Sequence, residues 1–289
     1  MHVAIVSCLE YCNKISEDVA LSYALQKQNI TNDVVAWDDV RVDWNKYNVA
    51  ILRSAWGYHK KYKIFLQWLN LLDGYSIPLV NDTNMVRWNT DKSIQFETLK
   101  KLNIPIIPYM ICSPDASLDK VYRNFGTTKL VIKPIVSASG DNTYAINVSG
   151  IESDTQQNFI RQKFKDSKFI VQPFIESISG GEYALVFIDG KFSHAVKRFP
   201  GIFTDKKQPV YVSKEQVPQK IYDIAVCAAE SIKRYFGISP VYARYDIVGE
   251  EIMEIELAEP DLMTRNIPKT KKQAALTKFA QIISKRYQR

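Results

Sequence analysis

The feature that most constrains this chain is a short acidic hairpin near its C-terminal end. The stretch Tyr242–Pro260 has the pattern of two strands joined by a tight turn at Gly249–Glu250. Side chains alternate between the faces of a strand, so Glu254 and Glu256 share a face, and an antiparallel partner places Asp246 beside them. Three carboxylates that close repel one another unless a cation lies among them. The hairpin predicts a Mg²⁺ site, because Mg²⁺ prefers such oxygen ligands; the alternative is a solvent-facing acidic hairpin.

The composition is that of an ordinary globular protein. The 289 residues, 46% hydrophobic and 24% charged, are enough to bury a substantial core. No apolar run approaches the roughly 20 residues of a membrane span, and the start, 1–8, turns polar too soon for a secretory signal. Cys8, Cys12, Cys112 and Cys227 lack paired CxxC spacing. We therefore expect reduced thiols and a cytoplasmic protein, without a zinc site or a disulfide framework.

The net charge of +7 comes partly from two basic runs near the C-terminus, Lys269–Lys272 and Lys285–Arg289. Such runs usually form a solvated helical face, and a basic cleft for a polyphosphate would account for part of the excess equally well. No RNP, zinc-finger or helix-turn-helix signature accompanies them, so we expect no nucleic-acid partner.

Strands and helices alternate in the first segment of the chain, which predicts a parallel, doubly wound sheet with functional residues at the strand ends. After one of these strands, the loop 52–59 offers Arg53, Ser54 and Tyr58, which suit an acidic small substrate. The alternative is an arginine that caps a neighbouring carboxylate. The expected strands are Val3–Cys8, Asp33–Trp37, Val49–Arg53 and Pro78–Val80, and the expected helices are Ile15–Gln28 and Tyr62–Leu72.

Two lysines stand where a phosphate would explain them. After a linker, Asn81–Asn89, Thr90 is expected to cap a helix, and Lys92 in its first turn opposes the helix dipole unless an anion occupies that end. Lys133 lies in an apolar strand, where a charge is costly without a partner. The loop Ser137–Thr143 that follows is rich in small residues whose backbone N–H groups can surround phosphates. The alternative is an edge-strand lysine beside an ordinary turn.

Two further segments complete the pattern. The apolar strand Phe169–Glu176 is interrupted by Pro173, which leaves neighbouring backbone groups free to pair with a ligand such as an adenine edge. A hairpin turning at Asp189–Gly190 follows, and its second strand ends in Lys197–Arg198, placed to meet an anion. We expect His194 on this hairpin to be a packed residue. Helices are expected at Leu118–Phe125, Thr155–Lys165, Gln219–Phe236 and Lys271–Tyr287.

Taken in this order, the predicted segments resemble those of the ATP-grasp superfamily along nearly the whole chain. Their sequence motifs are most similar to those of glutathione-synthetase-like and RimK-like ligases, particularly the branch that contains the D-cycloserine-forming cyclo-ligase. The motifs that carry the resemblance are Leu52–Tyr58, Arg87–Lys92, Lys133–Ala138, Gln172–Phe174, Gly190–Arg198 and Glu254–Pro260.

The resemblance implies an α/β (α+β) fold of three parts: a pre-ATP-grasp domain with a parallel sheet (1–88), a central subdomain with the phosphate loop (89–175) and a C-terminal subdomain with the metal site (176–289). It implies ATP and Mg²⁺ as cofactors, with Mn²⁺ as a second candidate ion. The nucleotide-binding residues it implies are Lys92, Lys133, Ser137, Ser139, Gln172, Pro173, Phe174, Ile175, Glu176 and Glu182. The metal ligands would be Asp246, Glu254 and Glu256, and the stabilising cations Lys197, Arg198 and Arg244. Arg53, Ser54, Tyr58 and Arg265 would grip the substrate.

The implied activity is that of an ATP-dependent ligase that joins a carboxylate to an amine, or to a thiol, through an acyl phosphate. Glu256 departs from the asparagine that glutathione-synthetase-like ligases place last in the metal motif, which leaves the number of metal ions open. Alternatives are an intramolecular cyclo-ligase, a ligase for peptide or protein tails, and an ATP-binding pseudoenzyme with a regulatory role. We expect small-molecule or peptide substrates and no membrane partner, and the oligomeric state is open.

Overall fold

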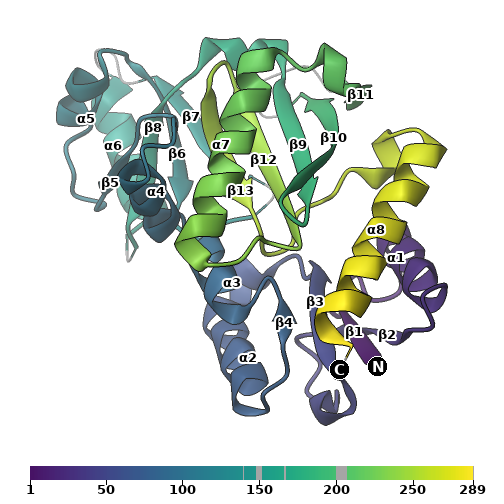
Figure 1. Ribbon diagram of the computed structural model, residues 1–289. Helices are drawn as coiled ribbons and strands as arrows, with labels where there is room; N and C mark the ends of the chain where they lie inside the picture. Colours follow the sequence, from purple (N-terminus) through teal and green to yellow (C-terminus); the bar gives the residue numbers. More distant parts are fainter. Residues whose placement is uncertain (139, 148–151, 166, 200–206, 289) are drawn as a thin grey trace.

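A computed structural model describes residues 1–138, 140–147, 152–165, 167–199 and 207–288. Within these ranges, thirteen strands form three separate sheets (Figure 1). None of the described helices is long and apolar enough to cross a membrane.

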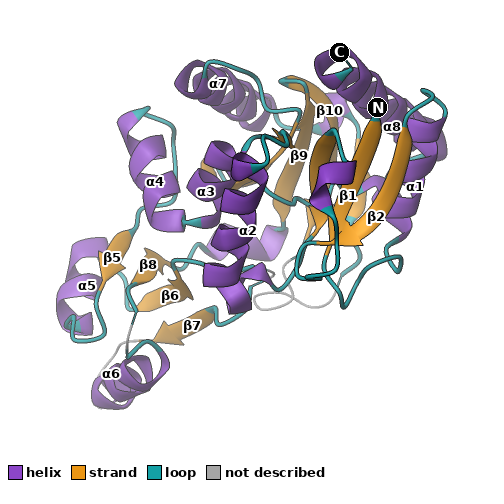
Figure 2. Cartoon of the chain, turned by 90° about the horizontal axis from the view of Figure 1, so that it is seen from below, coloured by secondary structure: helices purple, strands orange, loops and turns teal. Residues whose placement is uncertain are grey.

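The first sheet is parallel, with the order β2-β1-β3-β4. Its central strands β1 and β3 are runs of fully buried apolar residues, as expected of parallel strands covered on both faces. Helix α2 packs on one face, whereas α1 and the C-terminal helix α8 pack on the other (Figure 2). The parallel sheet predicted for this segment is confirmed. The elements are β1 His2–Ser7, α1 Ser16–Gln26, β2 Thr31–Ala36, β3 Val49–Ser54, α2 Tyr62–Gly74, β4 Leu79–Val80 and α8 Lys269–Tyr287.

The largest sheet is antiparallel, with the order β11-β10-β9-β12-β13. Its two hairpins turn where they were predicted, at Asp189–Gly190 and at Gly249, and all three of these residues have positive φ angles. Helix α7 covers one face of the sheet and packs its alanines against buried aromatic residues of β9 and β12 (Figure 1). The elements are β9 Glu182–Ile188, β10 Lys191–Arg198, β11 Val210–Val212, α7 Gln219–Phe236, β12 Tyr242–Val248 and β13 Glu251–Glu256.

The third sheet is also antiparallel, with the order β5-β8-β6-β7, and it packs against α5 and α6. The predicted break in the strand at Pro173 coincides with the end of β8. The elements are β5 Met110–Cys112, α5 Leu118–Phe125, β6 Lys129–Pro134, β7 Tyr144–Asn147, α6 Glu152–Lys163 and β8 Phe169–Pro173.

The segment 81–89, predicted to be a linker, is instead largely helical. Helix α3 (Thr83–Thr90) begins after Asp82, whose side chain accepts hydrogen bonds from the N–H groups of Asn84 and Met85. The next helix, α4 (Lys92–Lys101), is capped by Asp91 and not by Thr90. Both caps are residues that favour this role, but Asp91 stands one residue after the expected cap Thr90, and Asp82 stands inside the expected linker.

Packing does not follow the order of the chain. Helix α8 lies beside α1 and shares a core with the first sheet (Figure 1). Helix α4 buries Phe96 and Leu99 in the core of the largest sheet. The expected boundaries near residues 88 and 175 are therefore crossed by contacts between elements far apart in sequence.

Candidate active site

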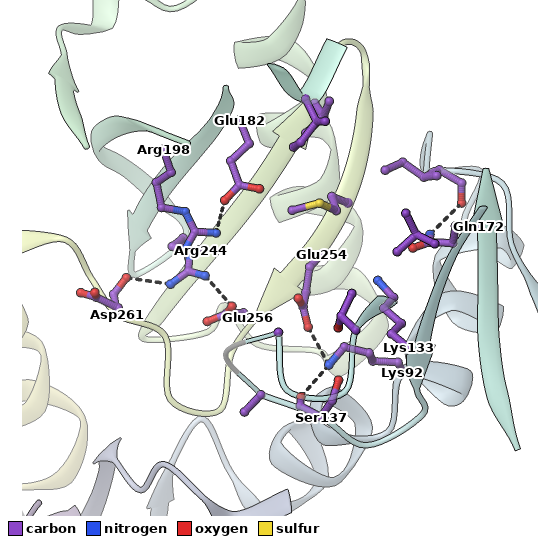
Figure 3. Close-up of a pocket in the computed structure, with 18 of the residues that line it drawn as sticks. Lys92, Lys133, Ser137, Gln172, Glu182, Arg198, Arg244, Glu254, Glu256 and Asp261 are labelled. Carbon is purple, nitrogen blue, oxygen red and sulfur yellow. Dashed lines mark hydrogen bonds and ion pairs between the residues drawn. The ribbon is translucent and has the colours of Figure 1, made fainter. Parts of the chain in front are cut away.

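A cavity of about 630 Å³ lies between the largest sheet and the sheet that contains β6 and β8. Strands β6, β8, β12 and β13 all contribute to its walls, together with α4 and the loop after β6 (Figure 3). The segments that the sequence assigned to phosphates, adenine and metal therefore meet around one space.

Lys92 connects α4, the loop after β6 and the acidic hairpin. Its Nζ donates to the carbonyl oxygen of Ser137 at 2.8 Å and lies 2.9 Å from Glu254 Oε1 (Figure 3). Burial opposes ionisation of Glu254, but Lys92 and Lys133 outweigh it and hold its pKa below the usual value. The cation at the start of α4 thus has an anionic partner at the cavity wall.

Lys133 is in a different position. It lines the cavity and is 7% exposed, and its Nζ lies 5.1 Å from the centroid of the Phe96 ring. Among the described residues it has no hydrogen-bond or ion-pair partner. Burial lowers its pKa to about 8, although Glu254 acts in the opposite direction. This lysine faces the cavity as a cation without a counter-ion in contact.

The predicted adenine wall is assembled from the end of β8 and the residues after it. Gln172, Pro173, Phe174 and Ile175 all line the cavity. Glu176 does not line it; its carboxylate is exposed and lies 2.6 Å from Lys129 Nζ. Phe174 donates its backbone N–H to the carbonyl of Lys129, which holds the segment close to β6.

Opposite this wall, two arginines hold carboxylates. Arg244 contacts Glu256 and donates to the carbonyl oxygen of Asp261 (Figure 3). It also lies within 2.8 Å of both carboxylate oxygens of Asp246. Arg198 contacts Glu182 and lies 2.8 Å from Asp246. Burial raises the pKa of Asp246, but the two arginines outweigh it and keep that carboxyl below its usual pKa. For Glu182, burial dominates and raises the pKa to about 7.

The three carboxylates predicted to share one metal do not converge in this structure. The predicted antiparallel pairing brings Asp246 beside the acidic strand, where it lies opposite Glu254, and Arg244 lies opposite Glu256. However, each carboxylate turns to a cation, and within the described ranges no three acidic, histidine or cysteine side chains form a metal-holding group. Glu254 and Glu256 line the cavity, whereas Asp246 is buried behind its wall. Burial raises the pKa of Glu256 to about 7 despite Arg244.

The predicted substrate residues divide into two groups. Tyr58 and Arg265 line the cavity, and Arg265 holds Asp261 and Glu17 at 2.6 and 2.8 Å. Ser54 does not line it, because its hydroxyl is buried against Asp18 and lies 2.8 Å from Ser7 Oγ. Arg53 also lies outside the cavity wall.

Arg53 is 7% exposed, its guanidinium carbon lies 5.3 Å from the centroid of the Tyr242 ring, and its Nη1 has no hydrogen-bond partner in the described chain.

The remaining predicted residues lie on strand β10 and in the loop after β6. Arg198 reaches the cavity, but Lys197, its neighbour on the other face of β10, places its Nζ 5.1 Å from the Tyr183 ring centroid and does not line the cavity. Ser137 lines the cavity, whereas Ser139 lies outside the described residues. His194 is a packed hairpin residue, as predicted, with its Nε2 2.7 Å from the carbonyl oxygen of Leu262.

The sequence reasoning missed several cavity residues, notably Trp56, Glu259, Asp261 and Met263. Trp56 and Glu259 stand inside motifs that carry the resemblance, so position within the motif was a usable signal. Asp261 and Met263 follow Pro260 in an irregular segment, where Met263 has a φ of 55°. No periodicity marks such a segment.

A family model agrees with this geometry. The model described as the ATP-grasp domain of prokaryotic glutathione synthetase matches residues 97–272, more than half of the chain. The chain belongs to the ATP-grasp family. It is therefore an ATP-dependent ligase that forms an amide, the reaction of the family to which the site motifs pointed. A second model, described as the N-terminal domain of the D-cycloserine synthetase DcsG, matches residues 3–81.

Individual proteins are similar to this ATP-grasp ligase in sequence and in structure. The cycloserine biosynthesis protein DcsG of Streptomyces lavendulae is 25% identical over 255 residues, which cover 83% of this chain and 85% of the relative. A crystal structure of D-cycloserine synthetase DcsG has a TM-score of 0.86 at 21% identity, covering 99% of this chain and all of the other. D-alanine–D-alanine ligase from Bacillus anthracis has a TM-score of 0.68 at 16% identity, covering 99% and 96%. Both structures share the fold predicted from the sequence.

Proposed function

We propose that this cavity activates a substrate carboxylate with ATP and condenses it with an amine on a small amino-acid-derived molecule. The observation that carries the proposal is the unpaired Lys133, a buried cation facing the same space as the 172–175 segment and Lys92. A nucleotide with its base against 172–175 would bring phosphates to both lysines, and an anion there would supply the missing partner of Lys133.

The donor set at the cavity suits Mg²⁺. If phosphates recruit Lys92, the carboxylate of Glu254 loses its partner, and the raised pKa of Glu256, about 7, indicates that this site has room for a further cation. Mg²⁺ is commonly held by one or two carboxylates and by substrate phosphates, which fits Glu254 and Glu256. The ion would neutralise charge on the transferring phosphoryl group. Asp246, which is buried outside the cavity wall, would orient Arg198 and Arg244 through its ion pairs with them.

The residues of this chain can then support both halves of the reaction. A carboxylate oxygen attacks the γ-phosphorus, and the bond to ADP breaks, giving an acyl phosphate. The amine nitrogen attacks the acyl carbon, the carbon–oxygen bond breaks, and phosphate leaves as the nitrogen loses a proton. Arg198 and Arg244, held rigidly by buried carboxylates, are placed to stabilise negative charge during these steps.

Exclusion of water falls to the loop after β6. His59, beside the first sheet, lies 2.9 Å from Asp141 of this loop, and Lys92 holds the Ser137 carbonyl at its start. These contacts would keep the loop over the phosphates, which protects an acyl phosphate from hydrolysis.

The intramolecular version of the reaction is a specific second candidate. The model described as the DcsG N-terminal domain matches residues 3–81, the part of the chain that carries Trp56 and Tyr58 to the cavity. A relative named for cycloserine biosynthesis covers most of the chain. These likenesses favour a substrate whose own amine closes a ring.

The test is release of phosphate from ATP with Mg²⁺, measured with pools of amino acids, hydroxy acids, peptides and amines. We expect release that depends on a particular carboxylate, with an amide product found by mass spectrometry. Glu254→Gln should reduce turnover by about 100-fold or more while leaving the fold intact, because a cavity carboxylate is lost. Glu251→Gln, on the same strand but away from the cavity, is the control. Equal turnover in the two variants would remove the argument for the cation site.

A further inference from the structure

Glu259 differs from the other carboxylates around the cavity. Four of these acids are committed: Glu182 to Arg198, Glu254 to Lys92, Glu256 to Arg244 and Asp261 to Arg265. Glu259 lines the same cavity, yet it has no hydrogen bond and no ion pair with any residue that the structure describes. A partly buried carboxylate without a partner is unfavourable, so this position is suited to a cation that arrives from outside the chain.

The backbone holds this carboxylate in a defined place. The buried hydroxyl of Tyr242 lies 2.8 Å from the carbonyl oxygen of Leu52 and 3.1 Å from that of Ala258. One hydroxyl therefore ties together the two peptide groups that immediately precede Arg53 and Glu259. Asn89 adds hydrogen bonds at 2.9 Å from the N–H groups of Leu257 and Ala258. Glu259 consequently extends from a segment whose two preceding residues are held by hydrogen bonds.

Arg53 and Glu259 carry opposite charges on these adjacent segments, but they form no ion pair with each other within the described chain. Arg53 is buried, and its Nη1 hydrogen has no acceptor. Burial and the neighbouring Glu256 raise the pKa of Glu259 well above its usual value, whereas Arg244, Arg53 and Lys92 act against this shift. A cation bound at Glu259 would favour the ionised carboxylate, and Arg53 does not occupy its hydrogen-bonding oxygens within the described chain.

We propose that Glu259 binds the ammonium group of an amino-acid substrate and thereby selects amine-bearing acids. The inference rests on the proposed ligase function and assigns its substrate class. Glu259 is the carboxylate without a partner among the described residues of the cavity wall, and an ammonium group complements its ionised form and supplies three hydrogen-bond donors. The apolar and aromatic side chains of Trp56, Tyr58 and Met263 line the same cavity, and they suit the carbon skeleton of a small amino acid.

The bound ammonium is not the nucleophile, because a protonated amine has no free electron pair. The amide is therefore formed by another amino group, either on a second molecule or elsewhere in the same substrate. Glu259 accordingly acts in recognition, and its loss should alter the choice of acid more than the chemistry of phosphoryl transfer.

The test uses the complete chain with ATP, Mg²⁺ and hydroxylamine as a general nucleophile that converts acyl phosphates to hydroxamates. The acids are the standard amino acids in both configurations and their counterparts with hydroxyl in place of the amine. We expect at least one amino acid to exceed its hydroxy counterpart by about tenfold or more in kcat/KM, as a buried charged contact allows. In Glu259→Gln this ratio should fall toward one, and Glu259→Asp should restore part of it, while the Kd for ATP stays the same in both.

The outcomes separate the inference from the function beneath it. A preserved ratio in Glu259→Gln, hydroxamate from hydroxy acids alone, or no hydroxamate from any amino acid would overturn the role of Glu259. Hydroxamate from hydroxy acids would still uphold an ATP-dependent ligase. Absence of ATP-dependent hydroxamate and phosphate release with every acid and amine pool would instead overturn the proposed function itself.

Discussion

Lys133 gives the sharpest test of the nucleotide site, because its proton is coupled to ATP binding. Burial brings its pKa to about 8 in the free protein. Phosphate oxygens favour the charged form, so the pKa rises when ATP binds, and binding then takes up a proton whenever the free lysine is neutral. The Kd for ATP should therefore exceed its value for the fully charged lysine by a factor of one plus the ratio of neutral to charged Lys133 in the free protein. This factor is about 1.1 at pH 7 and about 11 at pH 9. The sign is fixed: affinity falls as pH rises through 8.

The variant Lys133→Met separates this lysine from other titrating groups. Loss of one charge-assisted contact of about 1.5–3 kcal/mol should raise the Kd for ATP by about 10- to 100-fold at pH 7. The remaining Kd should then change much less between pH 7 and 9. Lys129→Met is the matched control, since Lys129 begins the same strand but is 58% exposed and pairs with Glu176. Isothermal titration calorimetry with ATP and Mg²⁺ measures the Kd for ATP of the wild type and the two variants at pH 7 and pH 9. An equal pH slope in wild type and Lys133→Met would refute the reasoning.

Two further predictions concern the contacts that hold the site together. Asn89→Ala removes hydrogen bonds to Ile255, Leu257 and Ala258 and should lower the free energy of unfolding by about 2–4 kcal/mol, whereas Asn45→Ala at an exposed position should cost under about 0.5 kcal/mol in the same denaturant titration. Similar losses in both variants would contradict a structural role for Asn89. His59→Phe removes the contact with Asp141 and should raise the KM for ATP by about 2- to 5-fold, equivalent to up to about 1 kcal/mol, with little change in the melting temperature. An unchanged KM would show that this pair does not hold the loop.

The parts of the fold that follow from local chemistry were predictable from the sequence. Asp189–Gly190 and Gly249 mark turns that only a few residue types adopt, and the strands beside them alternate in polarity. The register of the acidic hairpin did not follow from its turn alone: the turn pairs Val248 with Glu251 and Ile247 with Ile252, and a bulge between Asp246 and Ile247 then shifts the pairing so that Asp246 lies opposite Glu254. The cavity positions of Lys92, Lys133 and the 172–175 segment were predictable, because each is a local departure from an apolar pattern.

The segment 81–89 was misjudged because its residues have weak helical propensity but strong tertiary partners. Asn81 bonds the backbone of Val241, Tyr242 and Leu257, and Asn89 bonds that of Ile255, Leu257 and Ala258. These asparagines satisfy backbone groups of strands about 160 residues further along the chain. Local patterns cannot reveal partners at that separation, and asparagine read locally favours turns and loops.

Which acidic side chain pairs with which basic side chain likewise could not be predicted from the sequence. Five cations, Lys92, Lys133, Arg198, Arg244 and Arg265, line the cavity with five acids, Glu182, Glu254, Glu256, Glu259 and Asp261. The spacing of the acids in the sequence does not distinguish them, whereas the structure pairs four of them with cations. Among the residues that the structure describes, Glu259 and Lys133 have no ion-pair partner. Because the wall carries equal numbers of basic and acidic side chains, their count does not explain why a polyphosphate would bind there. The two side chains that lack a partner among the described residues favour an anion at Lys133 and a cation at Glu259. A substrate that carries an amine, positioned beside a nucleotide, supplies both charges at once.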